Sequence, residues 1–381
     1  MGFCQMAAVS RDRPVLAITS TDIRRDLIAP LRHFTRLRVV HFYRRAPYGD
    51  LTPDDMDESL IPYGNPLDLF RRLWQERIDI IQGVEPFSIR QLPYQAVIYL
   101  HVRIRRIPLV AGVHISRPLN KKYGYLPALL LRLILRPFLR STRIFFYLNE
   151  GGRRNLLWMG VPEAKLVRHM YGTWGVYPDE FTPVRNGREP DWGGWPVILF
   201  VGRLHEEKGV LDLLDAFDSV WREFPKARLV LVGNGPCRAE IKHLVAEHRW
   251  QEATVLTGPV KNRDLPPVFR SADVFCLPSI TTRKWEEYVG VVNIQAMACG
   301  VPVVSTHSGA IPEYVPDGVA GILVPERDPQ ALAGAILRLL SDEGLRRQMG
   351  EAGRTYAVEH YDARKNVQKA EEIILERCLG S

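Results

Sequence analysis

The sequence predicts an α/β protein of two domains, each a doubly wound parallel sheet, which face one another across a cleft. Two observations predict this class. Short apolar, β-branched runs alternate with helical patterns along most of the 381 residues, as expected for repeated βαβ units. The stretch 186–196, rich in Gly, Pro and Trp, interrupts this alternation and is typical of a linker. We therefore expect a first domain over residues 1–190 and a second over residues 191–360.

In the first half, four apolar runs predict strands: PVLAIT, LRVVHFY, IDIIQGVE and IPLVAGVHIS, at 14–19, 37–43, 78–85 and 107–116. A basic helix is expected after the first strand, ending at about Arg36. Helices in the intervals would make the crossover connections that parallel strands require. The first half is therefore expected to form one parallel sheet.

The second half alternates more clearly. Strands are predicted within VILFVGRL, ARLVLVGNG, ATVLTGPV, DVFCLPS, VPVV and GILV, starting at residues 197, 227, 253, 273, 301 and 321. Helices are expected over 209–224 and 237–248, and another after Asp328, whose side chain can cap it. Ligands of such sheets bind at the carboxyl ends of the strands, so the site is expected in the cleft between the domains.

A short helix is predicted between Gly290, which permits an abrupt turn, and Gly300 followed by Pro302, which stop it. The first N–H groups of a helix lack intrahelical partners and attract anions, so a phosphate could bind beside Gly290, Val291 and Val292. Two carboxylates, Glu286 and Glu287, precede this helix. They indicate a neutral, hydroxyl-rich group, namely a sugar, next to the phosphate.

The cysteines show neither paired nor metal-binding spacing, and no hydrophobic signal segment opens the chain. These features favour a reducing cytoplasm, and we expect neither a disulfide nor a structural zinc ion. The five cysteines are Cys4, Cys237, Cys276, Cys299 and Cys378.

The net charge of +8 is concentrated in one window, because residues 90–154 carry thirteen Lys and Arg but a single acid, Glu150. Within it, 120–148 mixes leucines with cations at helical intervals, a pattern suited to lying on an anionic membrane surface. Pro127, Pro137 and the charges argue against a membrane span. An ordinary core helix with a solvated basic stripe explains the pattern equally well. Nucleic-acid binding is a further alternative for a basic chain, but no recognised motif supports it.

The second half resembles the family-4 retaining glycosyltransferases of the GT-B fold, also described as glycosyl transferases group 1. The resemblance is carried by VGRLHEEKG, VGNGP, LTGPV, LPS, the Glu287-to-Gly300 unit and GILVPERDP, in that order. SGAIPE (308–313) is similar to the Gly-Gly-x-Pro-Glu turn of the family. In the first half, VAGVHIS resembles the segment that carries a substrate-facing histidine. The resemblance implies two Rossmann-like domains and a last helix, 361–381, that crosses back to the first domain.

For the reaction, the resemblance implies four catalytic candidates. Arg203 and Lys208 match the family's diphosphate-binding cations, which stabilise the departing nucleotide. Glu287 matches the first glutamate of the E-x7-E pattern, which binds donor-sugar hydroxyls. Glu286 takes that role if the loop is shifted by one residue. His114 would face the donor sugar.

The donor-binding candidates lie in the strand-end turns and at the start of the short helix: Gly202, Gly233, Gly235, Gly258, Val260, Gly290, Val291, Val292 and Gln295. Gln295 stands where the family has its second glutamate, which accepts hydrogen bonds from the ribose hydroxyls. Its amide keeps one acceptor oxygen but makes only neutral bonds, so weaker nucleotide binding is expected. This replacement leaves open the alternative of a non-catalytic sugar-nucleotide-binding homologue.

The first strand is followed by TSTDIRR (19–25), which lacks the glycine-rich loop usual in the family. The hydroxyls of Thr19, Ser20 and Thr21 are candidates to replace that loop. The implied reaction transfers a hexose from a UDP- or GDP-sugar to a lipid-linked or glycan acceptor, with retention of configuration. No metal and no other cofactor is expected. The expected location is the cytoplasm or the inner face of the cytoplasmic membrane.

Overall fold

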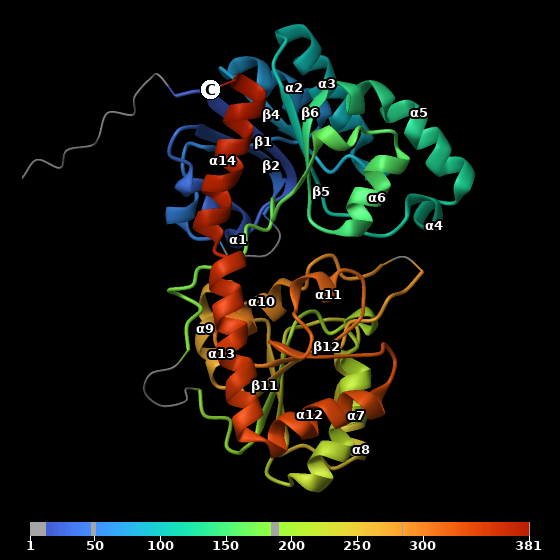
Figure 1. Cartoon of the computed structure of the whole chain (residues 1–381), viewed down its shortest axis with the longest axis vertical. Coiled ribbons are helices and arrows are strands. Elements are labelled where there is room, and N and C mark those ends of the chain that lie inside the picture. Colours follow the sequence, from blue (N-terminus) through green and yellow to red (C-terminus); the bar gives the residue numbers. More distant parts are fainter. Residues whose placement is uncertain (1–12, 47–50, 184–189, 284, 381) are drawn as a thin grey trace, which may run out of the picture. The chain divides into compact units, whose positions relative to one another are not determined.

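The structure, a computed structural model, describes residues 13–46, 51–183, 190–283 and 285–380. It contains two separate sheets with helices packed around them (Figure 1). The α/β class and the two doubly wound sheets expected from the sequence are thereby confirmed. Of the expected linker at 186–196, residues 186–189 lie outside the described residues.

Within the described residues the first sheet has seven strands, in the order β3-β2-β1-β4-β5-β6-β7. Strand β1 pairs in parallel with both β2 and β4, and β4 pairs in parallel with β5. The strands are β1 (Val15–Asp22), β2 (Arg38–Arg45), β3 (Leu60–Pro62), β4 (Ile80–Gly83), β5 (Leu109–Val113), β6 (Thr142–Tyr147) and β7 (Leu166–Arg168). All four strands predicted for this half are present, and their apolar side chains are buried because helices cover the sheet.

The helices of this half are α1 (Arg25–Ile28), α2 (Pro66–Gln75), α3 (Leu92–Arg105), α4 (Leu119–Tyr123), α5 (Tyr125–Ser141) and α6 (Glu150–Trp158). The basic helix expected to reach Arg36 is shorter. Its α-helical part ends at Ile28, and a 3-10 turn over Ala29–His33 replaces the rest. Pro30 accounts for the difference, since it has no N–H to donate within an α-helix.

The three hydroxyls expected to follow the first strand lie within it, because β1 extends to Asp22, and all three are hydrogen-bonded within the protein. Thr19 donates to the carbonyl of Gln82 at 2.7 Å, and the Ser20 hydroxyl lies 2.7 Å from Nε2 of His41. Thr21 accepts from the Gln91 amide at 2.9 Å. These bonds hold β1 to neighbouring segments, which gives the three side chains a local structural role.

The second sheet has six strands in the described part of the chain, ordered β10-β9-β8-β11-β12-β13. They are β8 (Val197–Val201), β9 (Arg228–Val232), β10 (Thr254–Gly258), β11 (Val274–Leu277), β12 (Val303–Thr306) and β13 (Gly321–Val324). Each of the five neighbouring pairs of strands in this order is parallel. Their carboxyl ends therefore lie at one edge of the sheet.

The helices of the second half are α7 (Val210–Glu223), α8 (Arg238–Glu247), α9 (Leu265–Arg270), α10 (Val291–Ala298), α11 (Ile311–Tyr314), α12 (Pro329–Ser341), α13 (Glu343–His360) and α14 (Ala363–Leu379). The expected cap is present, because the Asp328 carboxylate accepts the N–H of Ala331 at 2.9 Å. The short helix α10 has the expected boundaries, with Gly290 and Gly300 at φ values of 71° and 72°.

The chain forms two compact units. Apart from undescribed residues, the first comprises Met1–Gly112, Leu135–Phe146 and Val367–Ser381, and the second comprises Val113–Ile134 and Tyr147–Asn366. The expected boundary at residue 190 falls between the last strand of the first sheet and the first strand of the second.

Within the first unit, the last helix is bound through one buried carboxylate. Glu371 of α14 accepts the backbone N–H groups of Thr35, Arg36 and Leu37 at 3.1, 2.8 and 2.7 Å. Each of these bonds is charge-assisted, so together they attach α14 firmly to the segment before β2.

Candidate active site

The turns at the carboxyl ends of β8, β9 and β10 pack backbone against backbone. The N–H of Gly233 donates to the carbonyl of Gly258 at 2.8 Å. A Cβ added to Gly233 would lie 1.9 Å from the carbonyl oxygen of Gly202, and one added to Gly235 would lie 2.3 Å from that of Leu204. Glycine is therefore required here for packing between loops, whatever ligand approaches them.

Two of the candidate catalytic residues form an ion pair at this edge. Nζ of Lys208 lies 2.6 Å from Oε2 of Glu287, and the two side chains are only 16% and 10% exposed. Ser279 donates a second bond to the same carboxylate oxygen, at 2.9 Å. The ammonium also lies 4.5 Å from the centre of the Trp285 ring. Glu287 is thus the carboxylate held beside the cation, while Glu286 is half-buried next to it.

Arg203 follows β8 by two residues and has a different partner from Lys208. Its guanidinium pairs with Glu207, and its side chain is 63% exposed. The backbone carbonyl of Glu207 in turn accepts the N–H of Ile280, after β11. The structure therefore places Arg203 and Lys208 on the same loop, with one cation exposed and the other enclosed.

The start of α10 lies directly beside the Glu287 carboxylate. Gly290 occupies the position before the helix, and a Cβ added there would lie 3.6 Å from Cγ of Glu287. Val291 and Val292 form the first turn and are half-buried. The N–H groups of a first helical turn point out of the helix end, so partial positive charge lies next to the ion pair. Val260, after β10, is half-buried against the core.

Gln295 lies one turn into α10 and is 3% exposed. Its carbonyl oxygen, Oε1, is buried and has no hydrogen-bond donor within the part of the chain that the structure describes. A buried acceptor without a donor costs free energy on the order of 1–3 kcal/mol, which a hydrogen bond from a donor group would offset. The amide oxygen of Asn293, nearby on the same helix, is also buried without a hydrogen-bond donor among the described residues.

His114 follows β5 and belongs, with all the residues above, to the second compact unit. Its ring is half-buried, and a Cβ added to Gly172 would lie 2.6 Å from its Nε2. The His114 carbonyl accepts a bond from the Asn149 amide, which also donates to the carbonyl of Tyr288. The histidine segment is thus linked to the segment that carries Glu287.

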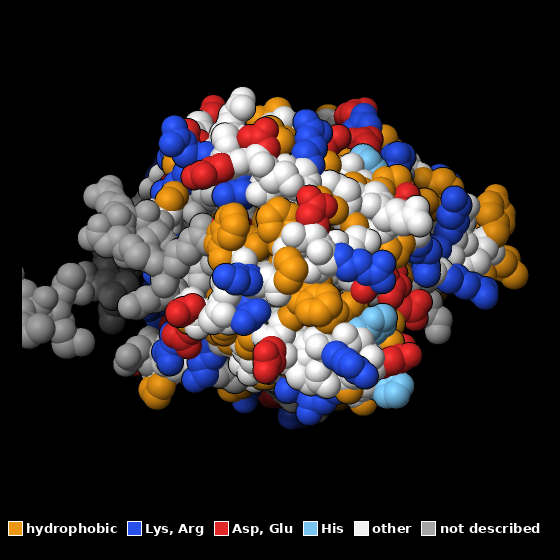
Figure 2. All heavy atoms as spheres, turned by 90° about the horizontal axis from the view of Figure 1, so that it is seen from below, with side chains coloured by type: hydrophobic (Ala, Val, Ile, Leu, Met, Phe, Trp, Pro, Cys, Tyr) orange, Lys and Arg blue, Asp and Glu red, His pale blue; other side chains and the backbone are white. Residues whose placement is uncertain are grey.

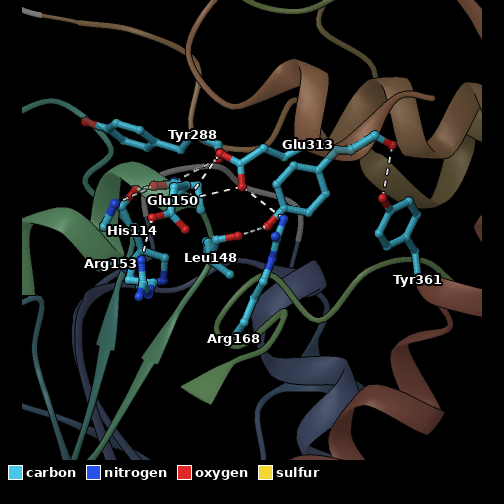
Figure 3. A network of polar contacts seen from close by, with 11 residues as sticks. His114, Leu148, Glu150, Arg153, Arg168, Tyr288, Glu313 and Tyr361 are labelled. Atoms are coloured by element: carbon cyan, nitrogen blue, oxygen red, sulfur yellow. Dashed lines mark hydrogen bonds and ion pairs between the residues drawn. The ribbon is translucent and has the colours of Figure 1, made fainter. Parts of the chain in front are cut away.

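A network of polar contacts continues this link (Figure 3). The Glu313 carboxylate accepts the N–H of Glu150 at 3.1 Å and pairs with Arg168 at 2.9 Å. The hydroxyl of Tyr314 donates to the carbonyl of Leu148. Burial raises the pKa of Tyr314, so this hydroxyl stays protonated and remains a donor. Glu313 ends the SGAIPE motif, which therefore has a structural partner in the segment after β6.

Sequence reasoning did not select Asn149 or Ser279 as site residues. Asn149 had a detectable signal, since an asparagine directly before a helical pattern is a common N-cap. The two bonds of its amide to distant carbonyls left no signal in the sequence, because one partner lies 139 residues further along the chain. Ser279 lies in the LPS motif, where a serine after a strand suggests only a turn.

In the described part of the chain, no group of three or more His, Cys, Asp or Glu side chains is arranged to hold a metal ion. No described helix is long and apolar enough to cross a membrane. On the face drawn in Figure 2, Lys and Arg side chains stand among acidic and hydrophobic ones and form no continuous basic area.

Comparison with known proteins identifies the second half. Residues 189–356 match the family model "Glycosyl transferases group 1". A GDP-mannose-dependent alpha-(1-6)-phosphatidylinositol monomannoside mannosyltransferase of Mycolicibacterium smegmatis is 32% identical over 207 residues, which is 52% of this chain and 54% of that protein. Alpha-D-kanosaminyltransferase of Streptomyces kanamyceticus is 26% identical over 66% of each chain. The chain thus matches about half to two thirds of the length of these relatives.

Solved structures support the fold over nearly the whole chain. Anabaena HepE, solved with UDP and glucose, superposes with a TM-score of 0.74 at 16% identity, covering 94% of this chain and 98% of that one. Sucrose-phosphate synthase from Thermosynechococcus elongatus gives a TM-score of 0.71 at 21% identity, covering 97% and 100%. At these identities the likeness concerns the fold alone, and it confirms the expected GT-B class.

Proposed function

Because residues 189–356 match the family model of the glycosyl transferases group 1, we propose that this GT-B protein transfers a hexose from a nucleotide-diphosphate sugar with retention of configuration. The donor is a UDP- or GDP-sugar, and the acceptor is lipid-linked or a glycan. The observation that carries the proposal is the enclosed Lys208–Glu287 ion pair beside the start of α10. A cation and a helix start suit a diphosphate, and a carboxylate suits sugar hydroxyls.

In the proposed reaction, negative charge grows on the nucleotide diphosphate as its bond to the anomeric carbon breaks. Lys208, Arg203 and the N–H groups at the start of α10 neutralise that charge. Glu287 accepts hydrogen bonds from hydroxyls of the donor sugar, and His114 faces the same sugar. The proposed reaction requires no metal ion, since these protein groups supply the positive charge.

Gln295 is proposed to accept a hydrogen bond from a ribose hydroxyl of the nucleotide. Its buried Oε1 lacks a donor among the described residues, and a ribose hydroxyl would supply one. A neutral amide makes weaker bonds to hydroxyls than a carboxylate does. A binding protein without turnover is the second candidate function, and it rests on this glutamine alone.

We expect a single nucleotide diphosphate, UDP or GDP, to raise the unfolding temperature, while ADP and dTDP do not. A ligand at a hundred times its dissociation constant stabilises the fold by about 2.7 kcal/mol. Gln295→Leu removes the proposed ribose bond, worth about 0.5–1.5 kcal/mol, so affinity should fall about two- to twelvefold. Gln75→Leu, at an exposed position on α2, is the matched control. Equal shifts for wild type and Gln295→Leu, or no shift with any nucleotide, would contradict the proposal.

We further propose that residues 120–148 bind the protein to an anionic membrane, where the acceptor would lie. Helix α5 has two apolar faces. One is buried and includes Ala128, Leu131 and Leu135, each at most 2% exposed. The other is open to solvent. Its large apolar side chains are Tyr125, Leu126, Leu130, Leu133 and Ile134, which are 69%, 65%, 51%, 58% and 62% exposed.

The positive charge beside the exposed apolar face of α5 favours an anionic bilayer as its partner. Leu126, Leu130 and Leu133 recur at helical spacing, and Arg136 and Arg140 lie beside them on exposed positions of the same helix. No acid occurs between residues 90 and 149. Each basic residue near an anionic surface contributes about 1 kcal/mol, and anionic lipid is typical of the cytoplasmic leaflet. We therefore propose the cytoplasmic face of the membrane as the site of action and a lipid-linked molecule as the acceptor.

The triple variant Leu130→Gln, Leu133→Gln, Ile134→Gln should lose most of its binding to vesicles of mixed neutral and anionic lipid. Each buried CH₂ is worth about 0.8 kcal/mol, so three lost aliphatic side chains weaken binding more than tenfold. Sedimentation at low salt measures this effect. Leu100→Gln, Ile104→Gln on α3 is the control, since these side chains are also 49% and 52% exposed. Unchanged sedimentation of the α5 variant, or no sedimentation of the wild type, would contradict the membrane proposal.

A further inference from the structure

Asn149 makes three hydrogen bonds that connect three separate segments of the second unit. Its residue is fully buried, at 0% exposure. Oδ1 accepts the N–H of Gly152 at 2.8 Å and so caps α6. Nδ2 donates to the carbonyl of His114 at 3.2 Å and to the carbonyl of Tyr288 at 3.1 Å. Both amide hydrogens and the amide oxygen therefore have partners, which fixes the orientation of the carboxamide.

The two carbonyls belong to the segments that carry candidate catalytic residues. His114 itself supplies one, and Tyr288 directly follows Glu287. One planar amide group thus sets how far the backbone of the histidine lies from the backbone of the glutamate loop. The proposed donor sugar is contacted by both side chains, so this separation matters for the reaction.

The residues on either side of Asn149, Leu148 and Glu150, also make hydrogen bonds to segments near Glu287. The residue before Asn149 accepts the hydroxyl of Tyr314, and the residue after it donates its N–H to Glu313. Glu313 and Tyr314 lie on α11, and the N–H of Ala310, directly before this helix, donates to the carbonyl of Glu287 at 2.9 Å. Figure 3 shows these contacts, with Glu150 and Arg168 lying beside the Glu313 carboxylate. Three consecutive residues after β6 therefore contact the loops around Glu287.

Resting on the proposed function, we propose that Asn149 is a positioning residue of the transfer reaction. It links the backbone of His114 to that of Tyr288 and thereby fixes the separation between the imidazole and the Glu287 carboxylate. A helix cap alone does not require asparagine, because serine and aspartate cap equally well. Only a side chain with two amide hydrogens serves both distant carbonyls while its oxygen caps α6.

The test uses Asn149→Ser, which keeps a capping oxygen but cannot donate to both carbonyls. Asn149→Asp is the second variant, because it keeps the shape and the cap and loses both donors. Asn65→Ser and Asn65→Asp are matched controls, since Asn65 caps α2 by accepting the N–H of Asp68 at 3.0 Å. Each purified full-length variant is assayed for donor turnover and for amide hydrogen exchange.

We expect Asn149→Ser to lower kcat about tenfold or more, with the donor KM changed less than about twofold, since the nucleotide is held by other residues. Amide exchange in peptides covering residues 285–290 should accelerate about tenfold, whereas the Asn65 variants change neither readout there. Unchanged exchange in that loop overturns the inference even if the wild type proves inactive with every donor. Inactivity of the wild type with every donor refutes the proposed function, and accelerated exchange in Asn149→Ser would then support only the structural link between the two segments.

Discussion

Lys208→Met should lower the turnover of the nucleotide sugar at least about a hundredfold, the usual cost of removing one transition-state charge donor. The ammonium of Lys208 is enclosed and lies 2.6 Å from Glu287, so no water-exposed cation can take its place without rearrangement. The measurement is the initial rate of nucleotide release with the donor that the nucleotide screen selects. Retention of more than about a third of the wild-type rate would exclude the proposed role of the lysine.

Stability must be separated from catalysis in this variant. Breaking a buried ion pair leaves an uncompensated carboxylate and can cost about 3–5 kcal/mol. Lys208→Arg keeps the charge and serves as the conservative comparison, while Lys242→Met at an exposed position on α8 controls for loss of charge. Unfolding temperatures are recorded for all three. A donor consumption that is measurable in the wild type and absent in a folded Lys208→Met protein would also eliminate the non-catalytic alternative.

Gly309→Ala should reduce activity more than about tenfold and lower stability by several kcal/mol. Gly309 has a φ of 55°, and a Cβ added there would lie 2.1 Å from the carbonyl oxygen of Glu287 and 2.8 Å from its nitrogen. Alanine therefore adds a backbone clash to the cost of a left-handed conformation, and the loop that carries Glu287 must move. Donor turnover and the unfolding temperature are measured together.

Gly318→Ala is the matched control for this prediction. Gly318 has a φ of 72°, but a Cβ added there would have no atom within 4 Å. Its cost is then only that of the left-handed backbone, about 1–2 kcal/mol, with activity retained. Equal effects of the two substitutions would mean that contact between Gly309 and the Glu287 loop is irrelevant to the reaction.

The order of strands and helices was readable from the chain because buried parallel strands are short apolar runs, and glycine, proline and capping residues mark where helices end. Helix α10 between Gly290 and Gly300 illustrates this, since local conformational preference alone sets both ends. The basic helix expected to reach Arg36 was wrong in length, because Pro30 removes a hydrogen bond that the charge pattern does not reveal.

Candidate residues were located by motifs, but their partners were not. Lys208 and Glu287 are 79 residues apart, and nothing in the spacing of either motif says that they form an ion pair. The Asn149 amide contacts Tyr288 across 139 residues, which only the packing of α6 against the loop before α10 brings about. Long-range polar pairs depend on how elements pack, and periodicity reports only which face of each element is apolar.

Helix α5 shows most clearly which properties follow from the sequence and which follow from the packing of the chain. The sequence by itself determined that residues 120–148 are leucine-rich, basic and free of acids, and these properties are compatible with a core helix or with a membrane-binding one. The tertiary structure decided which of the leucines are buried, since Leu131 and Leu135 are enclosed while Leu130 and Leu133 are exposed. The physical reason is that a helix with leucines on two sides can bury only the side that other parts of the chain cover, and helical periodicity does not say which side that is.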